Sequence, residues 1–299
     1  MASSPEMPPT CLRTFLHSLS PAPRTLRRAA ASLGVLALPL AATAQDLRPG
    51  AATRDSAPAV ASGGSLFRRS DAAVLAAFGA GAAIAYHNDR GIAHAFQRPG
   101  VQDNRALSGS AAVFRVVGQP GVLVGGVAAY GIGRLTHRRG LAAAGLHVSE
   151  AIAAAGVLTA AGKYVAGRSR PFVTDDQDPG DFQLWRGHRR GFTSMPSGHT
   201  SAAFAAASAL AIEWRAAAPG SARFGAPLAY AGAALVGASR VYHNRHWASD
   251  VVAGAALGTL SGVGVERLVR AHPDNALERH LVALQLIPST RGIAVAYSW

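Results

Sequence analysis

Six apolar segments rich in alanine and glycine dominate the sequence and restrict the folds that it can adopt. They span residues 71–86, 111–133, 141–162, 198–213, 226–239 and 248–265. The chain is 49% hydrophobic but only 7% aromatic, and such a supply of small apolar residues favours closely packed helices over a sheet. We therefore predict an all-α protein, a helical bundle of about six Ala/Gly-rich helices. The second helix should kink or split at Gln119-Pro120-Gly121, because proline removes a helical hydrogen bond.

The N-terminal region has the features of an export signal. Arg24, Arg27 and Arg28 precede the apolar run Ala29 to Leu40, and Ala42-Thr43-Ala44 then offers a small-residue cleavage site. An uncleaved membrane anchor is the alternative. An exported protein is expected in the periplasm or cell envelope.

Composition divides the chain into four parts. At the C-terminus, Pro288-Ser289-Thr290-Arg291-Gly292 lies between two β-prone runs and predicts a small β-hairpin. The expected parts are a signal peptide (1–44), a polar linker (45–70), a helical domain (71–270) and a C-terminal extension with the possible hairpin (271–299).

Whether the helices cross a membrane is left open by the sequence. A span needs about 20 apolar residues, and segments 71–86 and 226–239 are shorter than that. The second segment contains Arg115, the third contains His147 and Glu150, and the mean hydropathy of +0.17 is low for a polytopic protein. Buried helices of a soluble bundle look similar. We expect membrane association, with a soluble exported bundle as the alternative.

The net charge of +13 favours anionic partners. The arginines are scattered and are not interleaved with aromatic residues, so nucleic acid is not an expected partner. A basic exported protein instead fits an anionic membrane or a phosphate-bearing substrate.

The stretch Ser239 to Asp250 concentrates charge in a chain that is only 15% charged. His246 and Asp250 are four residues apart and share a face if a helix starts near His246. The carboxylate can then accept the proton of one imidazole nitrogen and leave the other free to attack. Arg240 adds a planar fork suited to phosphate oxygens. The alternative is a capped helix start with a surface ion pair.

Two further motifs also lie at the boundaries of predicted helices. Ser197 is a plausible N-cap of the fourth segment, whose free N–H groups attract an anion, and Gly198 allows close approach of the backbone. His199 would lie beside the same anion. Lys163, the only lysine in the chain, ends the third segment and precedes Arg170 by seven positions.

In this order, Lys-x6-Arg-Pro, Pro-Ser-Gly-His and Ser-Arg-x5-His-x3-Asp resemble the three-part signature of the type 2 phosphatidic acid phosphatase (PAP2) superfamily. This superfamily includes bacterial acid phosphatases and vanadium haloperoxidases. All three parts match without a gap over residues 163–250. The resemblance implies that His246 attacks phosphorus to form a phosphohistidine, that Asp250 orients it, and that His199 protonates the leaving oxygen. The implied phosphate-binding residues are Lys163, Arg170, Ser197, Gly198 and Arg240.

The implied activity is hydrolysis of phosphate monoesters or diphosphates, and the expected substrate is a lipid phosphate. Candidate substrates are phosphatidate, phosphatidylglycerophosphate, undecaprenyl diphosphate and lipid A. A soluble periplasmic acid phosphatase is one alternative, and a vanadate-dependent haloperoxidase with His246 as the vanadate ligand is another. A non-catalytic phosphate-binding protein would not need the His246–Asp250 pair or His199.

No cofactor is expected at this site. His243, His246 and Asp250 have plausible metal-ligand spacing, but the three nearby cations would repel a divalent ion. The sequence does not decide whether His243 is a metal ligand or a residue at the edge of the pocket.

The order of the motifs also predicts that they meet. They fall at the end of the third segment, the start of the fourth, the end of the fifth and the start of the sixth, which is one end of the bundle. If all six segments span a membrane after signal cleavage, that end is cytoplasmic. If the short first segment does not span, the site faces outward, which the basic loop Arg134 to Arg139 favours.

Overall fold

The computed structural model describes residues 68–173, 178–189, 191–272, 281, 284–289 and 292–297. The predicted signal peptide (1–44) and residues 45–67 of the predicted linker lie outside this part of the chain.

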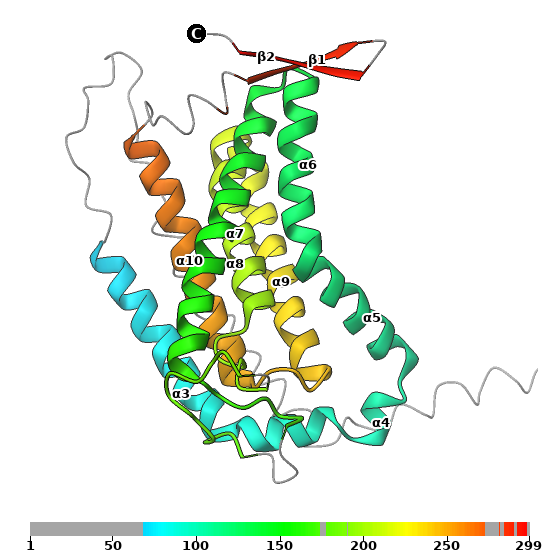
Figure 1. The fold of residues 1–299 in the computed structure, drawn as a ribbon, viewed down its shortest axis with the longest axis vertical. Coiled ribbons are helices and arrows are strands. Elements are labelled where there is room, and N and C mark those ends of the chain that lie inside the picture. The colour runs from blue at the N-terminus through cyan, green and yellow to red at the C-terminus, as the bar shows by residue number, and fades with distance from the viewer. Residues whose placement is uncertain are drawn as a thin grey trace, which may run out of the picture.

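The described residues form a helical bundle with a two-stranded hairpin at one end (Figure 1). All six predicted segments are helical, so the all-α prediction is confirmed, although the first helix begins at Arg69 and ends at Phe96. The helices are α3 (Arg69–Phe96), α4 (Pro99–Gln102), α5 (Arg105–Val116), η1 (Val117–Gly121), α6 (Val122–Leu135), α7 (Arg139–Ala166), α8 (Gly198–Ala217), α9 (Pro219–Tyr242) and α10 (Ala248–Ala271).

Helix α8 forms the core, and small residues let its neighbours approach closely. A Cβ atom added at Gly254, Gly258 or Gly262 of α10 would lie 2.6, 2.3 or 2.6 Å from a backbone oxygen of α8 or its N-cap. These glycines recur every four residues and thus form one smooth face of α10. The close contact fixes the start of α10 against the start of α8.

The predicted break in the second segment is present at η1. Gln119 has φ −157° and ψ 125°, outside the helical region, and Pro120 follows it. Helix α5 therefore diverges from α6 and runs toward the end of the bundle where α7 and α8 are connected (Figure 1). The break brings Arg115, near the end of α5, toward the predicted site.

Within the part of the chain that the structure describes, three stretches are long and apolar enough to cross a membrane: Arg105–Leu135, Arg139–Ala166 and Ala248–Ala271. Only 17% of the apolar window in the first stretch is buried. Its exposed large side chains are Leu107, Val113, Val116, Val117, Leu123, Val124, Val127 and Ile132. Such a continuous apolar surface is unfavourable in water, so these helices fit membrane association.

The predicted C-terminal hairpin is confirmed. Strands β1 (Leu284–Ser289) and β2 (Gly292–Tyr297) pair antiparallel, with Leu284 opposite Tyr297 and Ser289 opposite Gly292. The hydroxyl of Tyr130 on α6 donates a hydrogen bond to the carbonyl of Leu281 at 2.7 Å. The hairpin lies at the opposite end of the bundle from the connection between α7 and α8 (Figure 1).

Candidate active site

The three sequence motifs meet at one end of the bundle. They occupy the last turn of α7 with the following loop, the first turn of α8, and the loop between α9 and α10. The backbone N–H of Ser197 donates to the carbonyl of Asp250 at 3.0 Å, which joins the second motif to the third. The side chain of Lys163 lies beside Gly198, since a Cβ atom there would be 3.9 Å from the lysine Cε.

Asp250 is completely buried in the first turn of α10. Its Oδ2 accepts hydrogen bonds from the backbone N–H of Trp247 at 2.9 Å and from the hydroxyl of Ser194 at 2.5 Å. The carboxylate is thus fixed before it meets His246, whose Nδ1 is 3.7 Å from Oδ2. That separation allows an ion pair but is too long for a hydrogen bond.

His246 lies in the loop before α10 and is 3% exposed. Among the described residues, its Nδ1 has no hydrogen-bond partner. Burial lowers the pKa of His246 to about 4, and the Lys163 cation acts in the same direction while Asp250 opposes it. The imidazole is therefore neutral near pH 7. With its proton on the nitrogen facing Asp250, it keeps a lone pair on Nε2.

A buried arginine that sequence analysis did not single out lies behind Asp250. The guanidinium of Arg168 donates to Asp250 Oδ1 at 2.6 Å, to Asp89 Oδ2 at 2.8 Å and to the hydroxyl of Ser249 at 2.7 Å. Arg168, Asp89 and Asp250 all have 0% exposure. The cation has two carboxylate partners, and Asp89 also accepts from the backbone N–H of Ser249. This network locks the start of α10 to α3 and to the loop after α7.

Aromatic rings surround the same guanidinium. Its carbon lies 5.3, 5.0 and 5.4 Å from the ring centres of Tyr86, Phe182 and Trp247. The rings exclude water and contribute cation–π attraction. Trp247 also donates its indole N–H to the carbonyl of Ser169 at 2.9 Å.

The glycine that ends α7 positions two of the predicted cations. Gly167 has φ +52°, and a Cβ atom there would lie 1.9 Å from the carbonyl oxygen of Gln183. Only glycine fits this left-handed and crowded position. The turn brings Arg170 to Thr193, whose hydroxyl accepts from it at 3.0 Å. Lys163 also donates to the carbonyl of Thr193.

Arg240, the third predicted cation, differs from the other two. It is 6% exposed, and among the described residues its Nε and Nη1 atoms have no hydrogen-bond partner. A buried guanidinium without partners is costly. An anion that accepts hydrogen bonds from this guanidinium would reduce that cost.

Ser197 occupies the predicted N-cap position of α8, with φ −74° and ψ 112°, but makes no capping hydrogen bond. Its hydroxyl accepts from the hydroxyl of Thr200 at 2.9 Å instead. The side chain therefore does not occupy the N–H groups of the first turn, and they can bind an anion beside Gly198.

His199 lies among these cations. Burial, followed by Arg240, lowers its pKa to about 3, with His246, Arg115 and Arg170 acting in the same direction. His199 is therefore neutral when no anion is present. Arg115 of α5, noted in the sequence only as an obstacle to a membrane span, thus lies near enough to His199 for its charge to act on this imidazole.

His243 has a structural environment that the sequence could not establish. Its Nδ1–H donates to the carbonyl of Ser239 at 2.6 Å, one turn back in α9, and its ring contacts Tyr242 edge-on at 5.5 Å. This side chain thus closes the C-terminal turn of α9.

Comparisons with known proteins agree with the motifs. Residues 144–273 match the family described as the PAP2 superfamily. A lipid A 1-phosphatase of Porphyromonas gingivalis is 39% identical over 117 residues, which cover 38% of this chain and only 22% of that protein. A transmembrane PAP2-type phosphatidylglycerolphosphate phosphatase from Bacillus subtilis has a similar fold, with a TM-score of 0.50 and 21% identity over 67% of this chain and 96% of that one.

The Arg168 network predicts a large loss of stability when the cation is removed. Arg168→Gln leaves two buried carboxylates without their partner, and the free energy of unfolding should fall by about 3–5 kcal/mol. Arg186→Gln, an exposed position in the same loop, should change it by less than about 0.5 kcal/mol. Thermal unfolding of detergent-purified protein measures both. Equal effects of the two variants would show that the network does not hold the site.

Proposed function

Because residues 144–273 match the PAP2 superfamily, we propose that the chain is a phosphatase that hydrolyses a lipid phosphate through a phosphohistidine. The observation that carries this proposal is the buried guanidinium of Arg240, with two nitrogens that no described residue binds, close to the neutral His199 and at the same end of the bundle as the neutral His246. Arg240 and the N-terminus of α8 offer donors for phosphate oxygens. His246 supplies a nucleophile in the same place.

In the first step, Nε2 of His246 forms a bond to phosphorus while the bond from phosphorus to the leaving oxygen breaks. Lys163, Arg170 and Arg240 stabilise the charge on the other phosphate oxygens. Asp250 stabilises the imidazolium that develops. His199 transfers its proton to the leaving oxygen. In the second step, His199 takes a proton from water, whose oxygen attacks phosphorus and releases His246 and inorganic phosphate.

His199 must carry a proton when the substrate is bound, although its pKa is about 3 in the free site. Apart from burial, the causes of that low value are neighbouring positive or basic groups, led by Arg240. A phosphate group bound among them supplies compensating negative charge and raises the pKa of His199. The acid is therefore generated by substrate binding.

An apolar cavity next to the site supports a lipid substrate. It has a volume of about 200 Å³ and is bounded by α3, α4, α5 and α9. Phe114 and Ser239 line it, and each precedes a site arginine in the sequence, Arg115 and Arg240 respectively. Its other lining residues are Ala95, Phe96, Val101, Leu107, Ser110, Ala111, Leu235, Ala238 and Tyr242. A small soluble ester would leave this apolar cavity unfilled, whereas an acyl or prenyl chain can fill it.

We place the protein in the cell envelope with its site facing outward. Support comes from the predicted export signal and from the three apolar stretches of the described residues that are long enough to span a membrane. The loop Arg134 to Arg139, at the opposite end of the bundle from the site, then lies on the cytoplasmic side, as the positive-inside rule favours. No metal cofactor takes part in the proposed reaction.

The nucleophile is tested by trapping. His246→Ala should abolish turnover, and brief reaction of the unaltered protein with ³²P-labelled substrate should leave acid-labile label on His246, because a phosphoramidate bond hydrolyses in acid. Peptide mapping locates the label. Acid-stable label on a serine, or full activity of the variant, would refute the assignment.

The proton donor is tested with two leaving groups. An aliphatic alcohol needs the proton of His199, whereas p-nitrophenolate does not, and general acid catalysis contributes about 10²–10⁴-fold. His199→Ala should therefore slow the first step with phosphatidate far more than with p-nitrophenyl phosphate. Asp250→Asn, which disturbs the nucleophile, should slow both alike. Single-turnover rates are needed, since His199 also acts in the second step. Equal slowing of both substrates by both variants would contradict these roles.

The apolar cavity is tested by filling it. Ala111→Phe should lower kcat/KM for a long-chain lipid phosphate by about 10-fold or more, because each methylene kept out of the cavity forfeits about 0.8 kcal/mol. Turnover of p-nitrophenyl phosphate should be unchanged. Ala112→Phe, the same substitution at the exposed neighbouring position, is the control. If Ala111→Phe affects neither substrate, the lipid chain does not bind in this cavity.

A further inference from the structure

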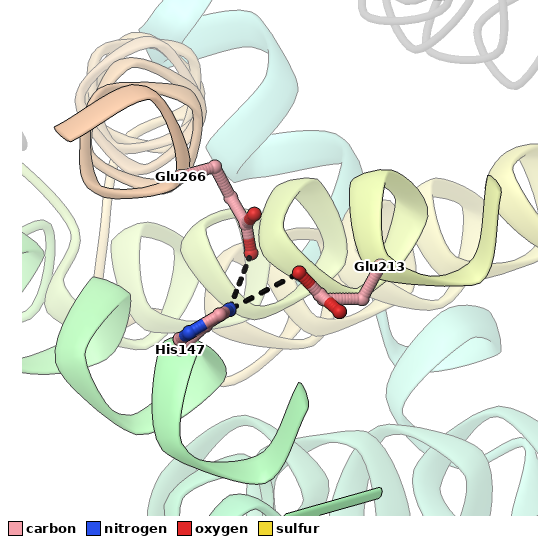
Figure 2. Close-up of side chains that lie close together, drawn as sticks. All are labelled: His147, Glu213 and Glu266. Atoms are coloured by element: carbon pink, nitrogen blue, oxygen red, sulfur yellow. Dashed lines mark hydrogen bonds and ion pairs between the residues drawn. The ribbon is translucent and has the colours of Figure 1, made fainter. Parts of the chain in front are cut away.

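Three ionisable side chains meet at the end of the bundle far from the proposed catalytic site. His147 of α7, Glu213 of α8 and Glu266 of α10 point toward one another (Figure 2). We call them the distal cluster. They take no part in the proposed reaction, because α7 and α8 carry the catalytic motifs at their other ends. We propose that the distal cluster binds a divalent transition-metal ion, with zinc as the best match.

The distances between the candidate ligand atoms fit a tetrahedral ion. His147 Nδ1 lies 3.1 Å from Glu213 Oε1 and 3.6 Å from Glu266 Oε1. Zinc binds nitrogen and oxygen ligands at about 2.0–2.2 Å, and a tetrahedron of that size separates its ligands by about 3.4 Å. All three atoms lie within 4.8 Å of one another. An imidazole nitrogen with two carboxylate oxygens is also a donor set that suits zinc.

Glu266 gives independent support for a ligand. It is 1% exposed, and its Oε1 has no hydrogen-bond partner among the described residues. Figure 2 shows the carboxylate directed toward His147. A buried carboxylate oxygen without a hydrogen bond is costly. A metal ion at the centre of the cluster would bind this oxygen directly.

Arg270 lies at the edge of the cluster and is compatible with the ion. It donates to Glu213 Oε1 at 2.8 Å and to Glu266 Oε2 at 3.2 Å. It thus orients both carboxylates as an outer partner. It leaves Glu266 Oε1 available, while Glu213 Oε1 would be shared between the arginine and the ion. Its side chain is 48% exposed, so solvent screens its charge. Two carboxylates outnumber this single arginine, in contrast to the active site, where cations dominate.

The ion would have a structural role. Its ligands come from three helices, so binding would clamp α7, α8 and α10 together at the end of the bundle away from the reaction. Bound metal should therefore raise thermal stability without changing turnover.

Direct binding measurements test the proposal with the full chain in detergent. After treatment with EDTA and its removal, the protein should bind Zn²⁺ by calorimetry and show a higher unfolding temperature with Zn²⁺. Co²⁺ should give the visible absorption of a tetrahedral site. Glu266→Gln and His147→Gln should each weaken Zn²⁺ binding by about 100-fold or more, because each removes a ligand and losing even an outer partner of a ligand costs about 10–100-fold. EDTA should leave hydrolysis of p-nitrophenyl phosphate unchanged.

Arg270→Gln is the matched control. Like Glu266→Gln, it breaks the Arg270–Glu266 ion pair, but it removes no ligand, so Zn²⁺ affinity should fall clearly less than in Glu266→Gln. Absence of Zn²⁺ binding, equal binding by the unaltered protein and Glu266→Gln, or equal loss in Glu266→Gln and Arg270→Gln would overturn the proposal. Each of these results would mean that the distal cluster is a set of ion pairs that binds no metal. None depends on catalytic activity, so the phosphatase assignment is tested separately.

Discussion

The buried guanidinium of Arg168 is the interaction on which the geometry of the candidate site depends. It binds Asp250 and Asp89 at once, at 2.6 and 2.8 Å, and none of the three side chains is exposed. A buried charge tolerates little displacement of its partners, because separation leaves each of them uncompensated. The start of α10, the loop after α7 and α3 are thereby held in fixed positions relative to one another. The position of His246 follows, since Asp250 lies behind it.

Much of the fold was predictable because helices and their breaks have local causes. Runs of small apolar residues marked all six helices, and Pro120 marked the break between α5 and α6. The order of the motifs predicted that they would meet, since consecutive antiparallel helices return the chain to the same end. Residues 163–250 therefore identified the candidate site. The chemical roles assigned to them remain predictions.

The parts of the site that could not be predicted depend on contacts between residues distant in the chain. Asp89 pairs with Arg168 79 positions later, and nothing in the sequence around Asp89 distinguishes it from a surface charge. In the sequence, Arg115 is a charge that interrupts a possible membrane span. In the fold, the break at η1 places it near His199. His147 was misleading in the same way, because its partners Glu213 and Glu266 come from other helices. A polar residue in an apolar helix could be interpreted only with its partners.

The break at η1 separates the part of the chain that lines much of the apolar cavity from the part that carries the three motifs. Residues 163–250 hold the three motifs, whereas much of the apolar cavity is lined by residues 95–114, before the break and before the matched family region begins at residue 144. Mutations in this earlier stretch can reshape the cavity without touching a motif. Under the proposed function, selection could then change which lipid is accepted while the phosphate chemistry stays intact. Related enzymes with the same motifs would diverge in substrate mainly through this part of the chain.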